Sequence, residues 1–176
     1  LNAMNFHTVW ILDPHSSKAK ELIRNCIVSY PHGQWIAVKN AVKYNAICFP
    51  DSGANKKYSS LFKNEISDYG SFVGNKIRNQ ATGELKYDGI YPYPGHNSCS
   101  DKNVLIVDDI CDAGNTFIQL AGLLKGRRVN EINLFVTHGI FSKGLKKLHE
   151  AGIMRIFTAK GEAFEQDGYV VYKEIK

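Results

Sequence analysis

The sequence contains few cysteines and no long apolar run. The four cysteines are scattered along the chain at Cys26, Cys48, Cys99 and Cys111, which is atypical of a small domain held together by disulfides. No leader-like segment and no apolar stretch long enough to cross a bilayer is present, which argues against secretion and membrane insertion. These absences predict reduced thiols, a cytoplasmic location and no membrane partner.

The positive charges lack the pattern that nucleic-acid binding requires. The formal net charge is +5, from 22 Lys and Arg against 17 Asp and Glu. The basic residues form short clusters at Lys56-Lys57, residues 125–128 and Lys146-Lys147, without interleaved aromatic residues or a DNA-reading motif. We therefore interpret most of them as solvated surface and predict no nucleic-acid partner.

A chain of 176 residues suits one ordinary domain that buries roughly 70% of its unfolded surface. We interpret Leu1-Asn2-Ala3, before Met4, as an expression remnant, and expect a single domain over residues 4–176.

One stretch combines a buried strand with acidic residues and a helix start. Val104–Val107 is continuously apolar and β-branched, which suits a parallel strand buried on both faces, and Asp108-Asp109 follows it directly. The carboxyl ends of such strands are where open α/β sheets bind ligands. The two acids therefore predict a site that holds hydroxyl groups, unless they only complement the dipole of the next helix.

The residues after the acidic pair predict a phosphate-binding turn. They are small or turn-forming, and a helical pattern begins at Phe117: Asp112, Ala113, Gly114, Asn115 and Thr116. Backbone N–H groups at a helix N-terminus, helped by the Thr116 hydroxyl, can bind a phosphate. Carboxylates beside a phosphate site predict a sugar phosphate as the ligand.

The whole stretch, an apolar strand followed by Asp-Asp, a short loop and Gly-x-Thr, resembles the ribose-phosphate loop of type I phosphoribosyltransferases. The resemblance implies that Asp108 and Asp109 hold the ribose 2- and 3-hydroxyls. It also implies that residues 112–116 hold the 5-phosphate. Ala113 and Asn115 stand where the family usually has threonine and glycine, and Asn115 adopts unusual backbone angles less readily than glycine.

A second strand end lies near the N-terminus. Thr8–Leu12 predicts a strand that ends at Asp13-Pro14-His15, and Ser16 is a plausible cap for the next helix. The expected inward positions of that helix are Ala19, Leu22, Ile23, Cys26 and Ile27. Asp-x-His-Ser resembles an element of the ribose-phosphate diphosphokinases, which implies a Mg-ATP role for His15; the alternative is an ordinary turn histidine.

A third strand end carries Asp51. The predicted strand Asn45–Phe49 leads into Pro50-Asp51-Ser52-Gly53, which resembles the Pro-Asp-x-Gly segment of the same kinases and implies that Asp51 helps to hold magnesium. Hard oxygen ligands suit Mg²⁺, which keeps several waters and substrate phosphates. The alternative is that Asp51 only caps a helix.

The polar stretch Gly74–Glu84 predicts a mobile loop. Its Lys76 and Arg78 match the Lys-x-Arg of the family's catalytic flexible loop, and this implies two catalytic cations. Charge builds on the transferred phosphoryl group, so cations delivered by a closing loop would lower the barrier electrostatically.

The remaining segments predict the fold class. Residues 131–136 and 153–158 are expected strands, Ser142 an expected helix cap, residues 169–175 an expected edge strand, and residues 34–44 either strand or helix. The alternation predicts an α/β fold, a doubly wound and mainly parallel sheet with helices on both faces. The strand ends at Asp13/His15, Asp51, Asp108–Thr116 and Thr137-His138 would then lie along one rim.

Thr-His-Gly-Ile-Phe-Ser at residues 137–142 closely resembles ribose-phosphate diphosphokinases. Those enzymes have two related halves, and this chain resembles the second half with a lead-in from the first. The resemblance implies a Mg²⁺-dependent transfer of diphosphate from ATP to ribose 5-phosphate, and a homo-oligomer. Two alternatives are a phosphoribosyltransferase that uses phosphoribosyl diphosphate and a base, and a non-catalytic regulatory subunit that only binds phosphoribosyl diphosphate.

Overall fold

The centre of the protein is a stack of parallel strands whose residues are apolar on both faces. The computed structural model describes residues 1–78, 85–93, 98–159, 164–166 and 169–172. The main sheet has eight strands in the order β5-β4-β3-β6-β7-β8-β10-β9. They are β3 (Ala46–Phe49), β4 (Ser71–Arg78), β5 (Leu85–Pro92), β6 (Asn103–Cys111), β7 (Glu131–Gly139), β8 (Ile153–Thr158), β9 (Phe164–Gln166) and β10 (Tyr169–Tyr172).

The ladder is parallel from β4 to β10, and only the two edge strands, β5 and β9, pair antiparallel. The expected strand at the C-terminus is therefore present as β10, but it lies inside the edge strand β9. The predicted mainly parallel sheet is confirmed.

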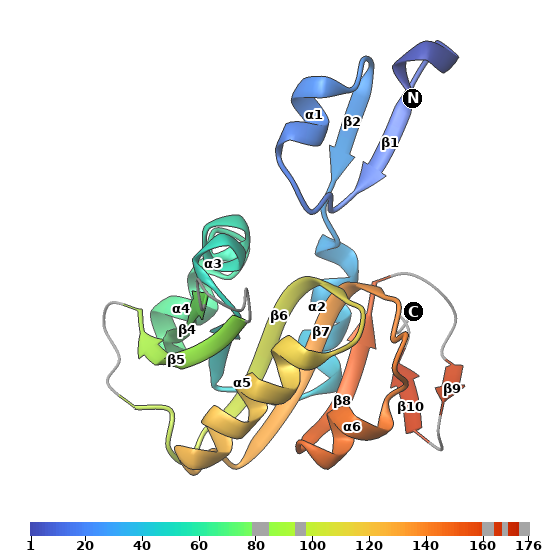
Figure 1. Cartoon of the computed structure of the whole chain (residues 1–176). Helices are drawn as coiled ribbons and strands as arrows, with labels where there is room; N and C mark the ends of the chain where they lie inside the picture. Colours follow the sequence, from blue (N-terminus) through green and yellow to red (C-terminus); the bar gives the residue numbers. More distant parts are fainter. Residues whose placement is uncertain (79–84, 94–97, 160–163, 167–168, 173–176) are drawn as a thin grey trace.

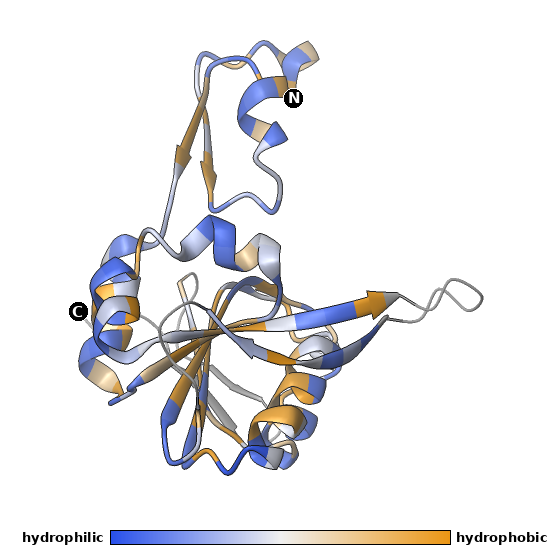
Figure 2. Cartoon of the chain, turned by 90° about the vertical axis from the view of Figure 1, so that its left-hand side faces the viewer, coloured by the Kyte–Doolittle hydropathy of each residue, from blue (hydrophilic) through white to orange (hydrophobic). Residues whose placement is uncertain are grey.

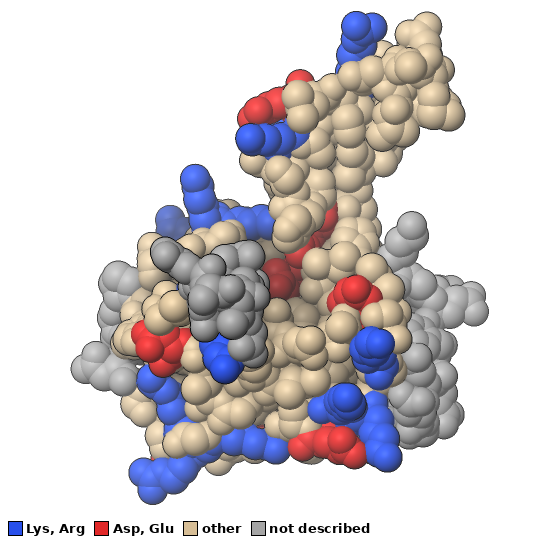
Figure 3. Space-filling model, in the orientation of Figure 1, with Lys and Arg blue, Asp and Glu red and all other residues tan. Residues whose placement is uncertain are grey.

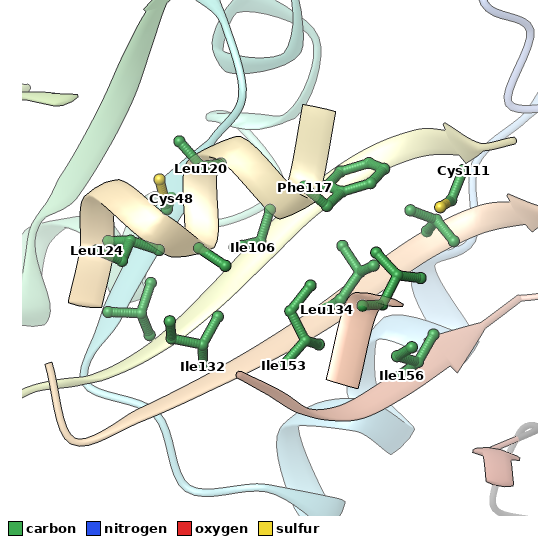
Figure 4. Packing of buried hydrophobic residues seen from close by; sticks show 14 of the residues in the cluster. Cys48, Ile106, Cys111, Phe117, Leu120, Leu124, Ile132, Leu134, Ile153 and Ile156 are labelled. Atoms are coloured by element: carbon green, nitrogen blue, oxygen red, sulfur yellow. The ribbon is translucent and has the colours of Figure 1, made fainter. Parts of the chain in front are cut away.

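Helices cover both faces of this sheet (Figure 1). One face packs against α5 (Asn115–Gly126) and α6 (Lys146–Glu150), and Figure 4 shows Phe117, Leu120 and Leu124 of α5 over the strand residues. The other face packs against α2 (His32–Ala41), α3 (Ser52–Tyr58) and α4 (Lys63–Tyr69). The ambiguous segment 34–44 is thus mostly helical, because Trp35 and Val38 of α2 are buried on one side of the helix.

The first thirty residues form an N-terminal arm that projects from the body (Figures 1 and 2). The arm contains a 3-10 helix η1 (Asn2–Met4), β1 (Val9–Leu12), α1 (Lys18–Leu22) and β2 (Cys26–Ser29). β1 and β2 make a separate two-stranded parallel sheet. None of the apolar side chains of residues 1–30 is buried, and Trp10 is 70% exposed.

Two local predictions about helix ends are wrong. The helix expected from Ala19 to Ile27 ends at Leu22, because Asn25 is left-handed and Cys26–Ser29 pairs with β1 in register. Ser142 does not cap α6, which begins at Lys146 after a turn closed by a hydrogen bond from Gly144 N–H to Phe141 O.

Two glycines provide a matched test of the packing. A Cβ on Gly74 would lie 2.6 Å from the Pro50 carbonyl oxygen and 2.5 Å from the Tyr87 ring, whereas a Cβ on Gly122 of α5 would meet nothing within 4 Å. We expect Gly74→Ala to lower the free energy of unfolding by about 2 kcal/mol through overpacking. Gly122→Ala should raise it by about 0.5–1 kcal/mol, because alanine favours a helix interior. Urea denaturation of both variants measures the two effects; equal effects would contradict the described close packing of Gly74 against Pro50 and Tyr87.

Candidate functional site

A cavity of about 700 Å³ lies at the carboxyl ends of the strands, between the arm and the body. Its lining comes from the base of the arm, the start of α3, β4, the end of β6 and the start of α5. Figure 3 shows acidic side chains at the bottom of the hollow below the arm. This is the position where open parallel sheets bind ligands.

Asp13 anchors the arm to the body. It is fully buried, with a left-handed backbone (φ 47°), and its Oδ2 accepts hydrogen bonds from the Tyr58 hydroxyl at 2.6 Å and from the Thr137 hydroxyl. A buried carboxylate is tolerated only when it is paired and hydrogen-bonded. Burial and the Asp13 hydrogen bond raise the pKa of Tyr58, so the phenol stays a donor.

Lys57 places a positive charge between the carboxylates of Asp13 and Asp109. Its Nζ lies 2.8 Å from Asp13 Oδ1 and 2.9 Å from Asp109 Oδ2, and it donates to the Pro14 carbonyl oxygen at 2.9 Å. The side chain is 17% exposed. Burial alone would lower the pKa of Lys57, but the hydrogen bonds to Asp13 and Asp109 outweigh it, and the pKa is raised.

The two acidic residues at the end of β6 face the cavity but have different partners. Asp109 is 5% exposed, and its Oδ2 accepts from Lys57 and from His15 Nδ1 at 3.0 Å. Among the described residues, no cation is hydrogen-bonded to Asp108 as Lys57 is to Asp109. Burial first, and the charge of Asp109 second, raise the pKa of Asp108 to about 7. Both side chains line the cavity, so two carboxyl groups with different partners lie side by side.

The raised pKa of Asp108 predicts a pH-dependent cost. Because the pKa of Asp108 in the folded protein, about 7, lies above the ordinary aspartate value of 3.8, the folded protein loses stability relative to an uncharged variant as pH rises from about 4 to 7. We expect Asp108→Asn to be more stable than wild type by roughly 1–2 kcal/mol at pH 8, allowing for water in the cavity, and by little at pH 4. Urea denaturation across this range measures it. Asp112→Asn, which removes an exposed carboxylate nearby, is the control; a gain independent of pH would contradict the assignment.

Asp51 is both a helix cap and a partner of Lys76. Its Oδ1 accepts from the Ala54 N–H at 3.0 Å, at the start of α3, and its Oδ2 lies 2.8 Å from Lys76 Nζ. Burial alone would raise the pKa of Asp51, but the hydrogen bonds from Lys76 and from Ala54 N–H outweigh it, and the pKa is lowered. Asp51 therefore does cap α3, and its role as a magnesium ligand stays a prediction.

Lys76 lies on a strand rather than in a loop, which corrects the expectation for residues 74–84. β4 continues through Arg78 and pairs with β5 as a hairpin, with a register shift between Asn75 and Lys76. The hairpin forms because Tyr87, Gly89 and their neighbours on β5 match the length of β4 and complete its backbone hydrogen bonds. The rest of the predicted loop, residues 79–84, lies outside the described residues.

The predicted phosphate turn is shorter than expected. β6 continues past Val107 to Cys111, because β7 pairs with it as far as Gly139. α5 begins at Asn115, directly after Gly114. Glycine is required at position 114 because φ is 80° and because a Cβ there would lie 3.0 Å from Leu148 Cδ2. Thr116 lines the cavity, and the first N–H groups of a helix have no partner within it. Asp112 and Ala113 lie between the strand and this N-terminus.

The structure brings several of the predicted strand ends together through recorded contacts: Asp13 with Thr137, His15 with Asp109, and Asp51 with Lys76. His138 also joins, since its Nε2 lies 3.0 Å from the Leu12 carbonyl oxygen. Within the described residues, no group of three or more His, Cys, Asp or Glu side chains converges as a metal site.

The sequence analysis did not identify Lys57 as a site residue, because it interpreted the Lys56-Lys57 cluster as solvated surface. A helix that starts at Ser52 puts Lys57 four residues after Gly53, on the face that lines the cavity. The usable signal was this spacing from a predicted strand end. None of the helices in the described ranges has the length and apolar character needed to cross a bilayer.

Comparison with known proteins supports the same fold. The chain is 27% identical over 141 residues to a ribose-phosphate pyrophosphokinase of Pyrococcus abyssi, which covers 79% of this chain and 47% of that protein. It is 32% identical over 98 residues to the chloroplastic ribose-phosphate pyrophosphokinase 3 of Arabidopsis thaliana, which covers 56% of this chain and 21% of that protein. The chain thus spans about half the length, or less, of these relatives.

Solved structures show the same architecture. A phosphoribosylpyrophosphate synthetase of Mycobacterium smegmatis superposes with a TM-score of 0.69 at 14% identity, over 89% of this chain and 50% of that one. An adenine phosphoribosyltransferase superposes with a TM-score of 0.51 at 16% identity, over 74% and 77% of the two chains. The phosphoribosyl transferase domain matches residues 59–167, more than half of this sequence. The expected resemblance is therefore confirmed, and the chain belongs to the phosphoribosyl transferase domain family.

Proposed function

We propose that this protein binds ribose 5-phosphate or phosphoribosyl diphosphate together with Mg²⁺, and transfers diphosphate from ATP to ribose 5-phosphate. The observation that carries the proposal is the pair Asp108 and Asp109 facing a cavity that Thr116 of α5 also lines. Carboxylates accept hydrogen bonds from sugar hydroxyls, and a helix N-terminus binds phosphate. A pentose 5-phosphate offers both kinds of group on one small molecule.

The cavity also supports a second, larger substrate. Its volume of about 700 Å³ lies in the range of sites for drug-sized ligands, which leaves room beside a pentose phosphate. His15 and Asp51 line the same cavity, and we assign them to the Mg-ATP side. Relatives of this chain are named ribose-phosphate pyrophosphokinases, a synonym of diphosphokinase.

The oxygen donors of the cavity fit magnesium. Asp51 would hold the ion with substrate phosphates and water, and His15, which lines the same cavity, would serve the same Mg-ATP site. Few protein ligands suit a cation that rarely uses a cage made only of protein groups. When bound, Mg²⁺ neutralises charge on the transferred phosphates. A site of this kind needs no convergence of three protein side chains.

The reaction makes one bond and breaks another. The anomeric oxygen of ribose 5-phosphate attacks the β-phosphorus of ATP, the bond from that phosphorus to the bridging α–β oxygen breaks, and AMP leaves with the electron pair. Lys76 lines the cavity beside Asp51, so its ammonium group is placed to stabilise the negative charge that develops on the transferred group. Arg78 is two residues further along β4, and we assign it the same role.

Phosphorus NMR tests the proposal. Purified protein with Mg²⁺, ATP and ribose 5-phosphate should form AMP and phosphoribosyl diphosphate in equal amounts, and EDTA should stop both. Release of diphosphate from phosphoribosyl diphosphate only when a base is added would instead assign the protein as a phosphoribosyltransferase, the activity named for the structural neighbour. Binding without turnover would assign it as a regulatory subunit.

A further inference from the structure

Lys57 connects three oxygens from two distant parts of the chain. Asp13 and Pro14 belong to the arm, whereas Asp109 belongs to β6 in the centre of the body. The Lys57 side chain starts from a third element, α3. The Lys57 ammonium group donates hydrogen bonds to the Pro14 carbonyl oxygen and to Asp109 Oδ2, and forms an ion pair with Asp13 Oδ1. Protein oxygens therefore surround the Lys57 ammonium group on three sides.

The contact with Lys57 determines which oxygen of Asp109 remains available. In the part of the chain that the structure describes, the recorded partners of the Asp109 carboxylate, Lys57 and His15, both bond to Oδ2. Among the residues that the structure describes, none donates a hydrogen bond to Asp109 Oδ1. Because two donors on one oxygen restrict the rotation of a carboxylate, Oδ1 is presented in one orientation to the cavity that Asp109 lines.

We propose that Lys57 is a positioning residue, which orients Asp109 so that Oδ1 accepts a hydrogen bond from the ribose 2-hydroxyl. The inference rests on the proposed sugar-phosphate site and adds to it the group that sets sugar specificity. The alternative is a structural role, in which Lys57 only neutralises the buried Asp13 carboxylate. The two roles predict different behaviour toward sugars that differ by one hydroxyl.

The test compares ribose 5-phosphate with 2-deoxyribose 5-phosphate. Lys57→Met alone leaves Asp13 and Asp109 buried without a cation, which can unfold the protein. The informative pair is therefore Asp13→Asn and the double variant Asp13→Asn/Lys57→Met, because asparagine can still accept from Tyr58 and Thr137 without needing a counter-ion. Circular dichroism and urea denaturation first establish that both are folded.

Calorimetry then gives the ratio of dissociation constants, deoxyribose over ribose, for each protein. We expect wild type and Asp13→Asn to prefer ribose 5-phosphate by tenfold or more, as one hydrogen bond to a charged group allows. In the double variant the ratio should fall at least fivefold. A purely structural Lys57 would weaken both sugars equally, so an unchanged ratio in the double variant overturns the inference.

The outcome also separates this inference from the function on which it rests. Wild type that fails to bind ribose 5-phosphate overturns the proposed function, and the role of Lys57 falls with it. Wild type that binds both sugars equally overturns the hydroxyl contact. Wild type that discriminates, with a double variant that does so equally well, overturns only Lys57. Lys57→Arg in the wild-type background should keep at least part of the preference, since guanidinium can also donate to both carboxylates.

Discussion

Asp13→Ala is expected to lower the free energy of unfolding by about 3 kcal/mol, because it removes one partner of a buried ion pair. The substitution removes one of the two carboxylates that pair with Lys57. It also removes the oxygen that accepts hydrogen bonds from the Tyr58 and Thr137 hydroxyls. Buried donors without an acceptor cost free energy even when the side chain that disappears was itself expensive to bury. Urea denaturation followed by tryptophan fluorescence measures the effect.

Asp101→Ala is the matched control for this substitution. Asp101 also has a left-handed backbone, with φ 59° against 47° for Asp13. Its side chain is exposed and, within the described part of the chain, accepts a hydrogen bond from Ser100 alone. The control therefore carries the backbone strain of alanine at positive φ, about 1 kcal/mol, without the buried charge. If the two variants lost the same stability, the ion pair and the hydroxyl contacts of Asp13 would not stabilise the fold.

The second large effect is expected at the sugar site. Asp108→Asn and Asp109→Asn should each weaken ribose 5-phosphate binding by roughly 30- to 100-fold, because each removes a hydrogen bond between a hydroxyl and a charged acceptor, worth about 1.5–3 kcal/mol. Calorimetry at pH 8, where Asp108 is ionised in the folded protein, measures the loss. The proposed enzyme, its transferase alternative and the regulatory alternative all require it.

Asp68→Asn serves as the control, because Asp68 is an exposed acid on α4 and is not among the residues that line the cavity. It changes the net charge by the same amount, so a general electrostatic effect on an anionic ligand would appear in all three variants. Affinity that stayed unchanged in Asp108→Asn and Asp109→Asn would contradict the sugar-holding assignment. Asp108→Asn should therefore have two opposite effects above pH 7. It should weaken ribose 5-phosphate binding and raise the free energy of unfolding of the unliganded protein.

The sheet could be predicted from sequence because its strands are buried on both faces. Val104–Val107, Glu131–Val136 and Ile153–Thr158 are short and mostly apolar, and such runs in alternation with helices leave few other topologies. The clustering of Asp51 and Asp108 at the carboxyl ends of β3 and β6 follows from that topology, whereas Asp13 reaches the cavity from the separate sheet of the arm. Only the lengths were underestimated, since pairing with a neighbour carries β6 and β7 beyond their apolar segments.

The remaining differences came from tertiary contacts that local patterns do not encode. The Lys76 segment is polar and glycine-flanked, as loops are, yet pairing with β5 makes it a strand. Cys26-Ile27 fits a helical stripe, but its neighbour across the arm is β1. Lys57 looks like surface charge until Asp13 and Asp109 are placed on either side of it. In each case the deciding partner is distant in the sequence.

The absence of a core in the arm has a consequence for the order of folding. Residues 1–30 bury no apolar side chain, and their anchor joins Asp13 to Thr137, 124 positions further along the chain. Loop-closure entropy opposes such a contact until the segments between are compact. The arm is therefore among the last segments to dock, and the entrance to the cavity is completed only after β7 has joined the sheet.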